Sequence, residues 1–188
     1  MGRQFAAGLL LLLGLPLTLQ GALPLGEQGL YLHRADGTRL DIGRVHFESV
    51  GDDRRRFRVE IDHRHFRDHF LSMKEFKCVD GDAEILCHVA YPYPMPDEVS
   101  EDDLSWLEHA LLFFYKKPDE FGARLRNGIY FQLEPAEGGL TGTPQAIDLD
   151  LISAPPEDTD AAPYSDEERV EIDPEERAFT GLSIEAVD

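Results

Sequence analysis

The chain has 188 residues, of which 37 are acidic and 18 are lysine or arginine, and its formal net charge at pH 7 is −19. Nucleic acids and anionic lipids bind to basic surfaces, so this charge excludes both as partners of the mature chain. With 42% hydrophobic and 10% aromatic residues, the composition is that of a folded protein. The length suits one domain followed by a tail.

The first 22 residues have the layout of a secretory signal peptide. Arg3 supplies a short positive region, a leucine-rich stretch begins at Leu9, and the small residues Gly21 and Ala22 follow. An N-terminal membrane anchor is the alternative, but the apolar run is shorter than the roughly 20 residues of a spanning helix. We expect cleavage near residue 22, a mature chain without a transmembrane segment, and a periplasmic or secreted location.

The only two cysteines are Cys78 and Cys87, with a turn signal at 80–82 between them. In an oxidising compartment such a pair predicts one disulfide, here between two strands joined by a short loop. Free thiols or a redox pair are the alternatives. Redox pairs usually have two intervening residues, whereas eight lie between these cysteines.

Alternating apolar residues predict the strands. The clearest case is Phe57, Val59 and Ile61, which alternate with charged residues. In the preceding strand the inward parity changes at Gly43, which predicts a β-bulge or a sharp bend there. The same period-two pattern indicates further strands around residues 30–32, 40–47, 85–91, 129–133, 140 and 147–151.

One main helix is expected at residues 101–117. Ser100 is a suitable N-cap, acidic residues fill the first turn at 101–103, and Lys116 and Lys117 lie in the last turn. Pro118 then ends the helix.

These elements predict an α+β fold class. A single domain, residues 25–154, holds a mostly antiparallel, curved or barrel-like sheet of about seven to eight strands packed on the helix at 101–117. Residues 155–188 contain twelve acidic residues and two arginines. A segment of this composition cannot bury enough apolar surface, so we expect a disordered acidic C-terminal tail.

The histidine-rich segment His63–His69 is the candidate metal site, with His63, His65 and His69 as ligands. On a helix, His65 and His69 would lie one turn apart on one face. Arg64 and Arg67 oppose cation binding, and the segment lacks the glutamate of an H-E-x-x-H motif. If the preceding strand continues instead, the histidines are ordinary strand residues.

No pattern assigns a catalytic or cofactor-binding residue. No serine lies in a Gly-x-Ser-x-Gly elbow, and no phosphate loop or dinucleotide fingerprint occurs. An acidic run at 80–84 covers only part of a calcium loop. Aromatic side chains offer a possible groove for a peptide or glycan: Tyr91, Tyr93, Met95, Trp106, Tyr115 and Tyr130.

The sequence therefore favours an exported, non-catalytic binding or accessory protein without a cofactor. We expect its partner to be a protein, peptide or glycan of a bacterial cell envelope, because the single asparagine, Asn127, is not in a glycosylation motif. The alternative function is a metal-dependent hydrolase using His63–His69. A third hypothesis is that the acidic surface serves solubility in high salt.

Overall fold

The structure is a computed structural model that describes residues 22–187, so the signal peptide predicted at 1–22 lies outside the described residues except for Ala22. Twelve strands form one sheet. In chain order they are β1 (Gly26–Arg34), β2 (Arg39–Ser49), β3 (Arg54–Ile61), β4 (Arg67–Leu71), β5 (Lys74–Asp80), β6 (Ile85–Val89), β7 (Glu98–Ser100), β8 (Leu112–Lys116), β9 (Gly128–Ala136), β10 (Gly139–Ile147), β11 (Val170–Glu171) and β12 (Phe179–Ala186).

Helical structure is limited to short pieces. The described residues contain one α-helix, α1 (Ser105–Ala110). The remaining pieces are the 3₁₀ turns η1 (His63–His65), η2 (Leu125–Asn127), η3 (Leu149–Ile152), η4 (Asp166–Glu168) and η5 (Pro174–Glu176). None of the helices within 22–187 is long and apolar enough to cross a membrane.

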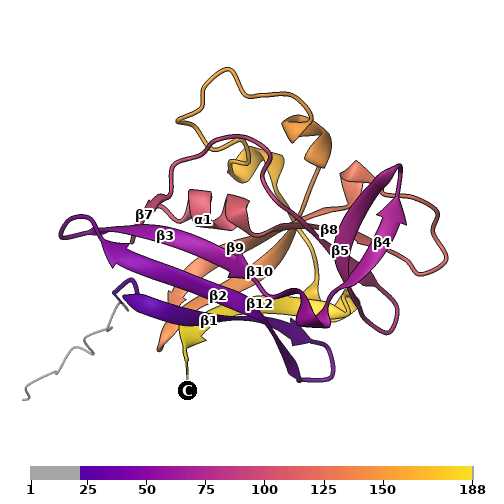
Figure 1. The fold of residues 1–188 in the computed structure, drawn as a ribbon, viewed down its shortest axis with the longest axis horizontal. Coiled ribbons are helices and arrows are strands. Elements are labelled where there is room, and N and C mark those ends of the chain that lie inside the picture. The colour runs from indigo at the N-terminus through magenta and orange to yellow at the C-terminus, as the bar shows by residue number, and fades with distance from the viewer. Residues whose placement is uncertain (1–21, 188) are drawn as a thin grey trace, which may run out of the picture.

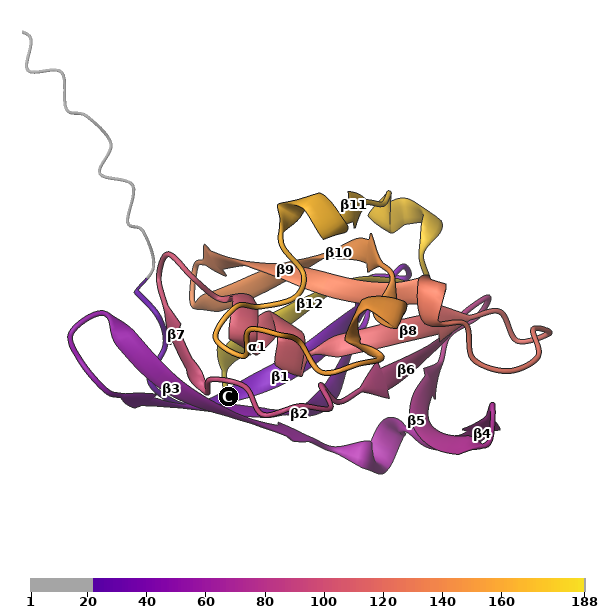
Figure 2. The same cartoon turned by 90° about the horizontal axis from the view of Figure 1, so that it is seen from above.

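The sheet is antiparallel and open, in the order β4-β5-β6-β8-β9-β10-β12-β1-β2-β3-β7, with β11 beside β10. Its two edges are β4 and β7. The sheet curves around α1, which lies between the part formed by β9 and β10 and the part formed by β1–β3 (Figure 2). Buried side chains of α1, such as Leu107, belong to the same core cluster as Phe57 and Phe131 of these two parts.

The predicted α+β class, with a main helix at 101–117, is wrong. Only Ser105–Ala110 is α-helical, and Leu112–Lys116 forms β8, which pairs with β6 and β9. The segment Leu112–Phe114 is buried, and an apolar run of this kind has no period that separates a helix from a buried strand. Bulky aromatic residues favour the strand.

The predicted disorder of the C-terminal segment is also wrong for its described residues, 155–187, which include β11 and β12. Strand β12 lies in the middle of the sheet, with Ile184 opposite both Leu30 of β1 and Leu140 of β10. All three side chains are buried. The prediction averaged charge over the whole segment, and this average hid the apolar alternation of its last ten residues.

The bend expected at Gly43 is confirmed. The register between β1 and β2 shifts where Leu30 faces Gly43 and Tyr31 faces Asp41, so one residue of β2 is bulged out. A Cβ atom on Gly43 would collide with the carbonyl oxygen of Glu60 in β3, and only glycine allows this approach.

Candidate functional site

A cavity of about 440 Å³ lies where α1, β9 and the segment between β10 and β12 meet. Figure 2 shows this segment, in orange, crossing over α1. We call the cavity the acidic pocket, because its lining includes the carboxylates of Glu101, Asp102, Asp103, Glu108 and Asp166. Arg169, Tyr130 and Tyr164 line it as well.

Glu108 of α1 forms the floor of the acidic pocket and is only 6% exposed. Strand β8 pairs with β9 only at Gly128 and Ile129. Along the rest of β9, from Tyr130 onward, the side of the strand that β8 leaves unpaired lies against α1. There Glu108 Oε1 accepts the N–H of Leu133 at 2.6 Å, and Oε2 accepts the hydroxyl of Tyr130. Burial raises the pKa of the Glu108 carboxyl, and these two hydrogen bonds oppose the shift in part.

His109 joins the segment after β10 to α1. Its ring is completely buried, with Nδ1 2.7 Å from the carbonyl oxygen of Ser105 and Nε2 3.2 Å from the backbone nitrogen of Tyr164. These contacts assign the proton to Nδ1, which donates, while Nε2 accepts the Tyr164 N–H. Burial lowers the pKa of His109 to about 4, so the ring is neutral at pH 7.

Arg169 closes one side of the acidic pocket. Its guanidinium lies 4.8 Å from the centre of the Tyr130 ring and forms an ion pair with Asp166. Its Nε donates to the carbonyl oxygen of Ser165 at 3.1 Å, and Ser165 begins η4 with a capping box. A cation is thus already stacked on the aromatic floor.

The floor and the rim of the pocket differ in their free bonding capacity. Glu108 and His109 each make two hydrogen bonds, and the Ser105 hydroxyl donates to Asp103 at 2.6 Å. Glu101 and Asp102 on the rim are exposed, and neither forms an ion pair with any side chain of residues 22–187. The floor is therefore a fixed scaffold, and the rim offers open negative charge.

The structure does not bring the three candidate metal ligands together. His63 and His65 are exposed on η1, whereas His69 lies on β4 with Nε2 3.4 Å from Asp80. Asp62 accepts the N–H of Arg64 and begins η1. Within the described part of the chain, no group of three or more histidine, cysteine or acidic side chains is arranged to hold a metal ion.

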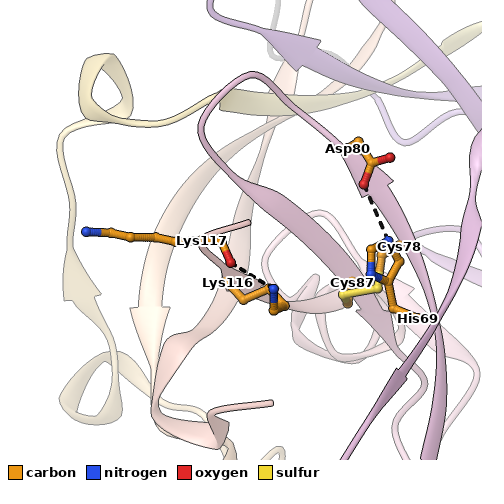
Figure 3. Close-up of a disulfide and its surroundings, with 6 residues drawn as sticks. All are labelled: His69, Cys78, Asp80, Cys87, Lys116 and Lys117. Atoms are coloured by element: carbon orange, nitrogen blue, oxygen red, sulfur yellow. Dashed lines mark hydrogen bonds and ion pairs between the residues drawn. A yellow bond between two sulfur atoms is a disulfide. The ribbon is translucent and has the colours of Figure 1, made fainter. Parts of the chain in front are cut away.

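The disulfide between Cys78 and Cys87 is confirmed. The two residues lie opposite each other on β5 and β6, and both are buried (Figure 3). Asp80, in the acidic run after Cys78, pairs with Arg67 and His69 of β4. The disulfide thus joins the β4–β5 hairpin covalently to the rest of the sheet.

The expected aromatic groove is not an open surface. Trp106 and Tyr130 are buried, and the Tyr91 ring lies 6.1 Å from Trp106 and 5.9 Å from His109. These rings pack on one another beneath the acidic pocket. The aromatic side chains therefore support the site from inside.

Sequence reasoning missed Glu108, His109 and Arg169. The first two fall within the helix that was expected at 101–117, and Arg169 falls within the tail that was expected to be disordered. A usable signal was present: Glu108 and His109 form an isolated polar pair between Trp106–Leu107 and Ala110–Leu111. Polar residues inside an apolar run need buried partners.

Comparison with protein-family models, curated proteins and solved structures finds no significant match to this chain. The function is therefore argued from the geometry of the site.

Proposed function

We propose that the chain is an exported, non-catalytic binding protein that receives a positively charged group in the acidic pocket. The observation that supports this most is the combination of a cavity of about 440 Å³ with an acidic lining. A volume of this size falls within the range of about 300–1,000 Å³ that small-ligand sites occupy.

The chemistry of the lining favours a planar cation or an amine. Glu101 and Asp102 are open carboxylates at the mouth, and the Tyr130 ring already carries the guanidinium of Arg169. A guanidinium or ammonium group of a ligand would meet these open carboxylates at the mouth. We therefore propose an arginine- or lysine-bearing peptide segment as the ligand class.

A binding role accounts for the floor better than catalysis does. Glu108 has a raised pKa, as general acids often have, but both its oxygens accept hydrogen bonds from Tyr130 and Leu133. His109 is likewise held between Ser105 and Tyr164. His109 therefore has no ring nitrogen left for a ligand, and both oxygens of Glu108 are engaged within the fold.

The proposal of export is supported by the N-terminal pattern and by the disulfide. A structural disulfide persists in an oxidising compartment, and we propose the periplasm or the extracellular medium. Fractionation of the native cells and the intact mass of the isolated chain test this. A full-length, reduced chain in the cytoplasm would contradict it.

The binding proposal is tested by calorimetric titration with arginine amide at low salt. We expect weak, salt-dependent binding, because exposed ion pairs contribute little each. The double variant Glu101→Gln/Asp102→Asn should abolish it. Glu175→Gln/Glu176→Gln, which removes the same charge from exposed η5, is the matched control and should bind like the unmodified chain.

Two results would contradict this function. Equal binding in both double variants would mean that only the overall charge attracts the probe. Hydrolysis or modification of an arginine-containing peptide by the purified chain would replace the non-catalytic role by an enzymatic one.

A further inference from the structure

The β4–β5 hairpin ends the sheet, and its outer strand β4 is an edge. Figures 1 and 2 show the hairpin projecting at one end of the molecule, away from β1 and β3. Two large apolar side chains of the hairpin face solvent: Phe70 is 75% exposed and Met73 is 91% exposed. Exposed apolar groups on an open sheet edge are typical of a pairing surface.

The turn of the hairpin holds Met73 in an unusual backbone conformation. Ser72 and Met73 form the two-residue turn, with φ angles of 50° and 68°. Glycine, asparagine and aspartate are the usual residues in such a turn, and a bulky side chain is disfavoured there. The chain thus keeps a large, exposed apolar residue where folding alone favours a small one.

The hydrogen-bonding pattern shows which backbone groups face the open side of β4. Leu71 and Lys74 close the two-residue turn and are therefore a hydrogen-bonded pair. Because the pattern alternates, His69 and Arg67 also bond to β5. The N–H and C=O groups of Asp68 and Phe70 consequently point outward, where no strand of residues 22–187 pairs with them.

This arrangement is self-complementary. If two β4 strands meet antiparallel about a two-fold axis at His69, Asp68 of each copy faces the partner's Phe70. Both residues present outward groups, so they exchange hydrogen bonds, and all five residues of β4 overlap. The two Phe70 rings then lie on the same face as diagonal neighbours, within contact distance of each other.

The charges agree with this register. Arg67 faces the partner's Leu71 and Asp68 faces the partner's Phe70, so no two like charges are opposed. A register centred on Asp68 would oppose two carboxylates, and one centred on Phe70 would overlap fewer residues. The two Asp68 carboxylates are diagonal neighbours in this register, and each forms an ion pair with Lys77 of its own copy, which offsets their repulsion.

We propose that β4 is a homodimerisation edge, through which two copies join their sheets into one continuous sheet. The hairpin is suited to this because the Cys78–Cys87 disulfide fixes its base, and Ser72 Oγ accepts the N–H of Ala123 at its tip. The interface is small, since it consists of one five-residue strand pair and a few apolar side chains. We therefore expect a reversible dimer of the transient class. The proposal is independent of the acidic pocket.

Sedimentation velocity of the mature chain, with its disulfide intact, tests the proposal from about 1 μM to about 1 mM, where an interface of this size associates. We expect a monomer–dimer equilibrium whose dissociation constant rises about tenfold or more in Phe70→Asp. Val170→Asp is the matched control, because Val170 is also an exposed apolar residue on a strand but lies on β11. It should dimerise normally.

A thiol trap tests the register. His69 faces itself across the axis, so His69→Cys should give a disulfide-linked dimer on mild oxidation. Asp68→Cys places the two new thiols as diagonal neighbours about 7–8 Å apart, which is too far for a disulfide, so it should not be linked in this way. A monomer at the highest concentration, or a dimer that Phe70→Asp leaves unchanged, would overturn the proposal. Thermal unfolding of each variant checks that it is folded.

Discussion

The buried ring of His109 makes a sharp prediction about acid stability. Its pKa is about 4 in the folded chain and 6.5 in an unfolded one. Between pH 4 and pH 6.5 the His109 ring is mostly protonated in the unfolded chain and mostly neutral in the folded chain. The contribution of His109 to stability is therefore complete above pH 6.5 and is lost as the pH falls towards 4.

The magnitude follows from the two pKa values. A difference of one in pKa corresponds to about 1.4 kcal/mol, so the full effect of His109 is about 3 kcal/mol, and about 2.5 kcal/mol of it is lost between pH 7.5 and pH 4.5. Burial is the main cause of the low pKa. The nearby positive charge of Arg169 lowers it further, whereas the hydrogen bond to Ser105 and the negative charge of Asp103 raise it.

The substitution His109→Gln isolates this effect. The glutamine oxygen can accept the N–H of Tyr164, but the side chain does not titrate. We expect the variant to be less stable than the unmodified chain at pH 7.5, and the gap to narrow by about 2.5 kcal/mol at pH 4.5. Urea unfolding measures both values, and Trp106, the single tryptophan, provides the fluorescence signal.

A second histidine, His88, gives an independent check of the same effect. Burial also lowers the pKa of His88 to about 4, so the stability difference between the unmodified chain and His88→Gln should narrow in the same way as the pH falls. The raised pKa values of Glu84 and Glu108 make the fold more stable as the pH falls, but this contribution is the same in every variant and cancels from the differences. A stability gap between the unmodified chain and His109→Gln that is the same at both pH values would refute the assignment of a neutral, acceptor Nε2.

Three further predictions concern the sheet. Replacing both cysteines by alanine should lower the free energy of unfolding by about 2.5 kcal/mol, because the disulfide closes a short loop. Urea titration measures this loss, and adding reductant to the unmodified chain should lower its free energy of unfolding by the same amount. Ile184→Ala should cost about 2–4 kcal/mol, because Ile184 is fully buried in β12; a loss below about 0.5 kcal/mol would mean that β12 is not docked in solution. Met73→Gly should stabilise the chain by about 1 kcal/mol, since glycine accepts φ 68° freely, whereas Lys74→Gly in the adjacent strand should destabilise it.

The sequence predicted those parts of the fold that depend on residues close together in the chain. The disulfide follows from two cysteines separated by a turn signal, and the bulge at Gly43 follows from a change of parity in the apolar pattern. The residues 112–116 were not predictable in this way. Their apolar side chains are buried in either a helix or a strand, and only the pairing of β8 with β6 and β9 decides between them.

The acidic pocket was beyond prediction for a related reason. Its lining comes from three separate places in the chain: residues 101–108, residues 130–135 and residues 162–169. No local pattern indicates that these segments meet. The contact depends on the order of strands in the sheet, which follows from long-range pairing.

The position of β12 explains how the third segment reaches the pocket. The chain leaves the sheet at the end of β10, pairs with β10 again at β11, and then re-enters the middle of the sheet at β12, which also pairs with β10. The residues between these strands are thus anchored at both ends, and the Tyr164–His109 hydrogen bond holds their middle against α1. If the acidic pocket binds a ligand as proposed, that ligand would contact this segment and α1 together, and its binding energy would add to the stability of the docked segment. Substitutions in the buried face of β12, far from the pocket, should therefore weaken ligand binding as well as folding.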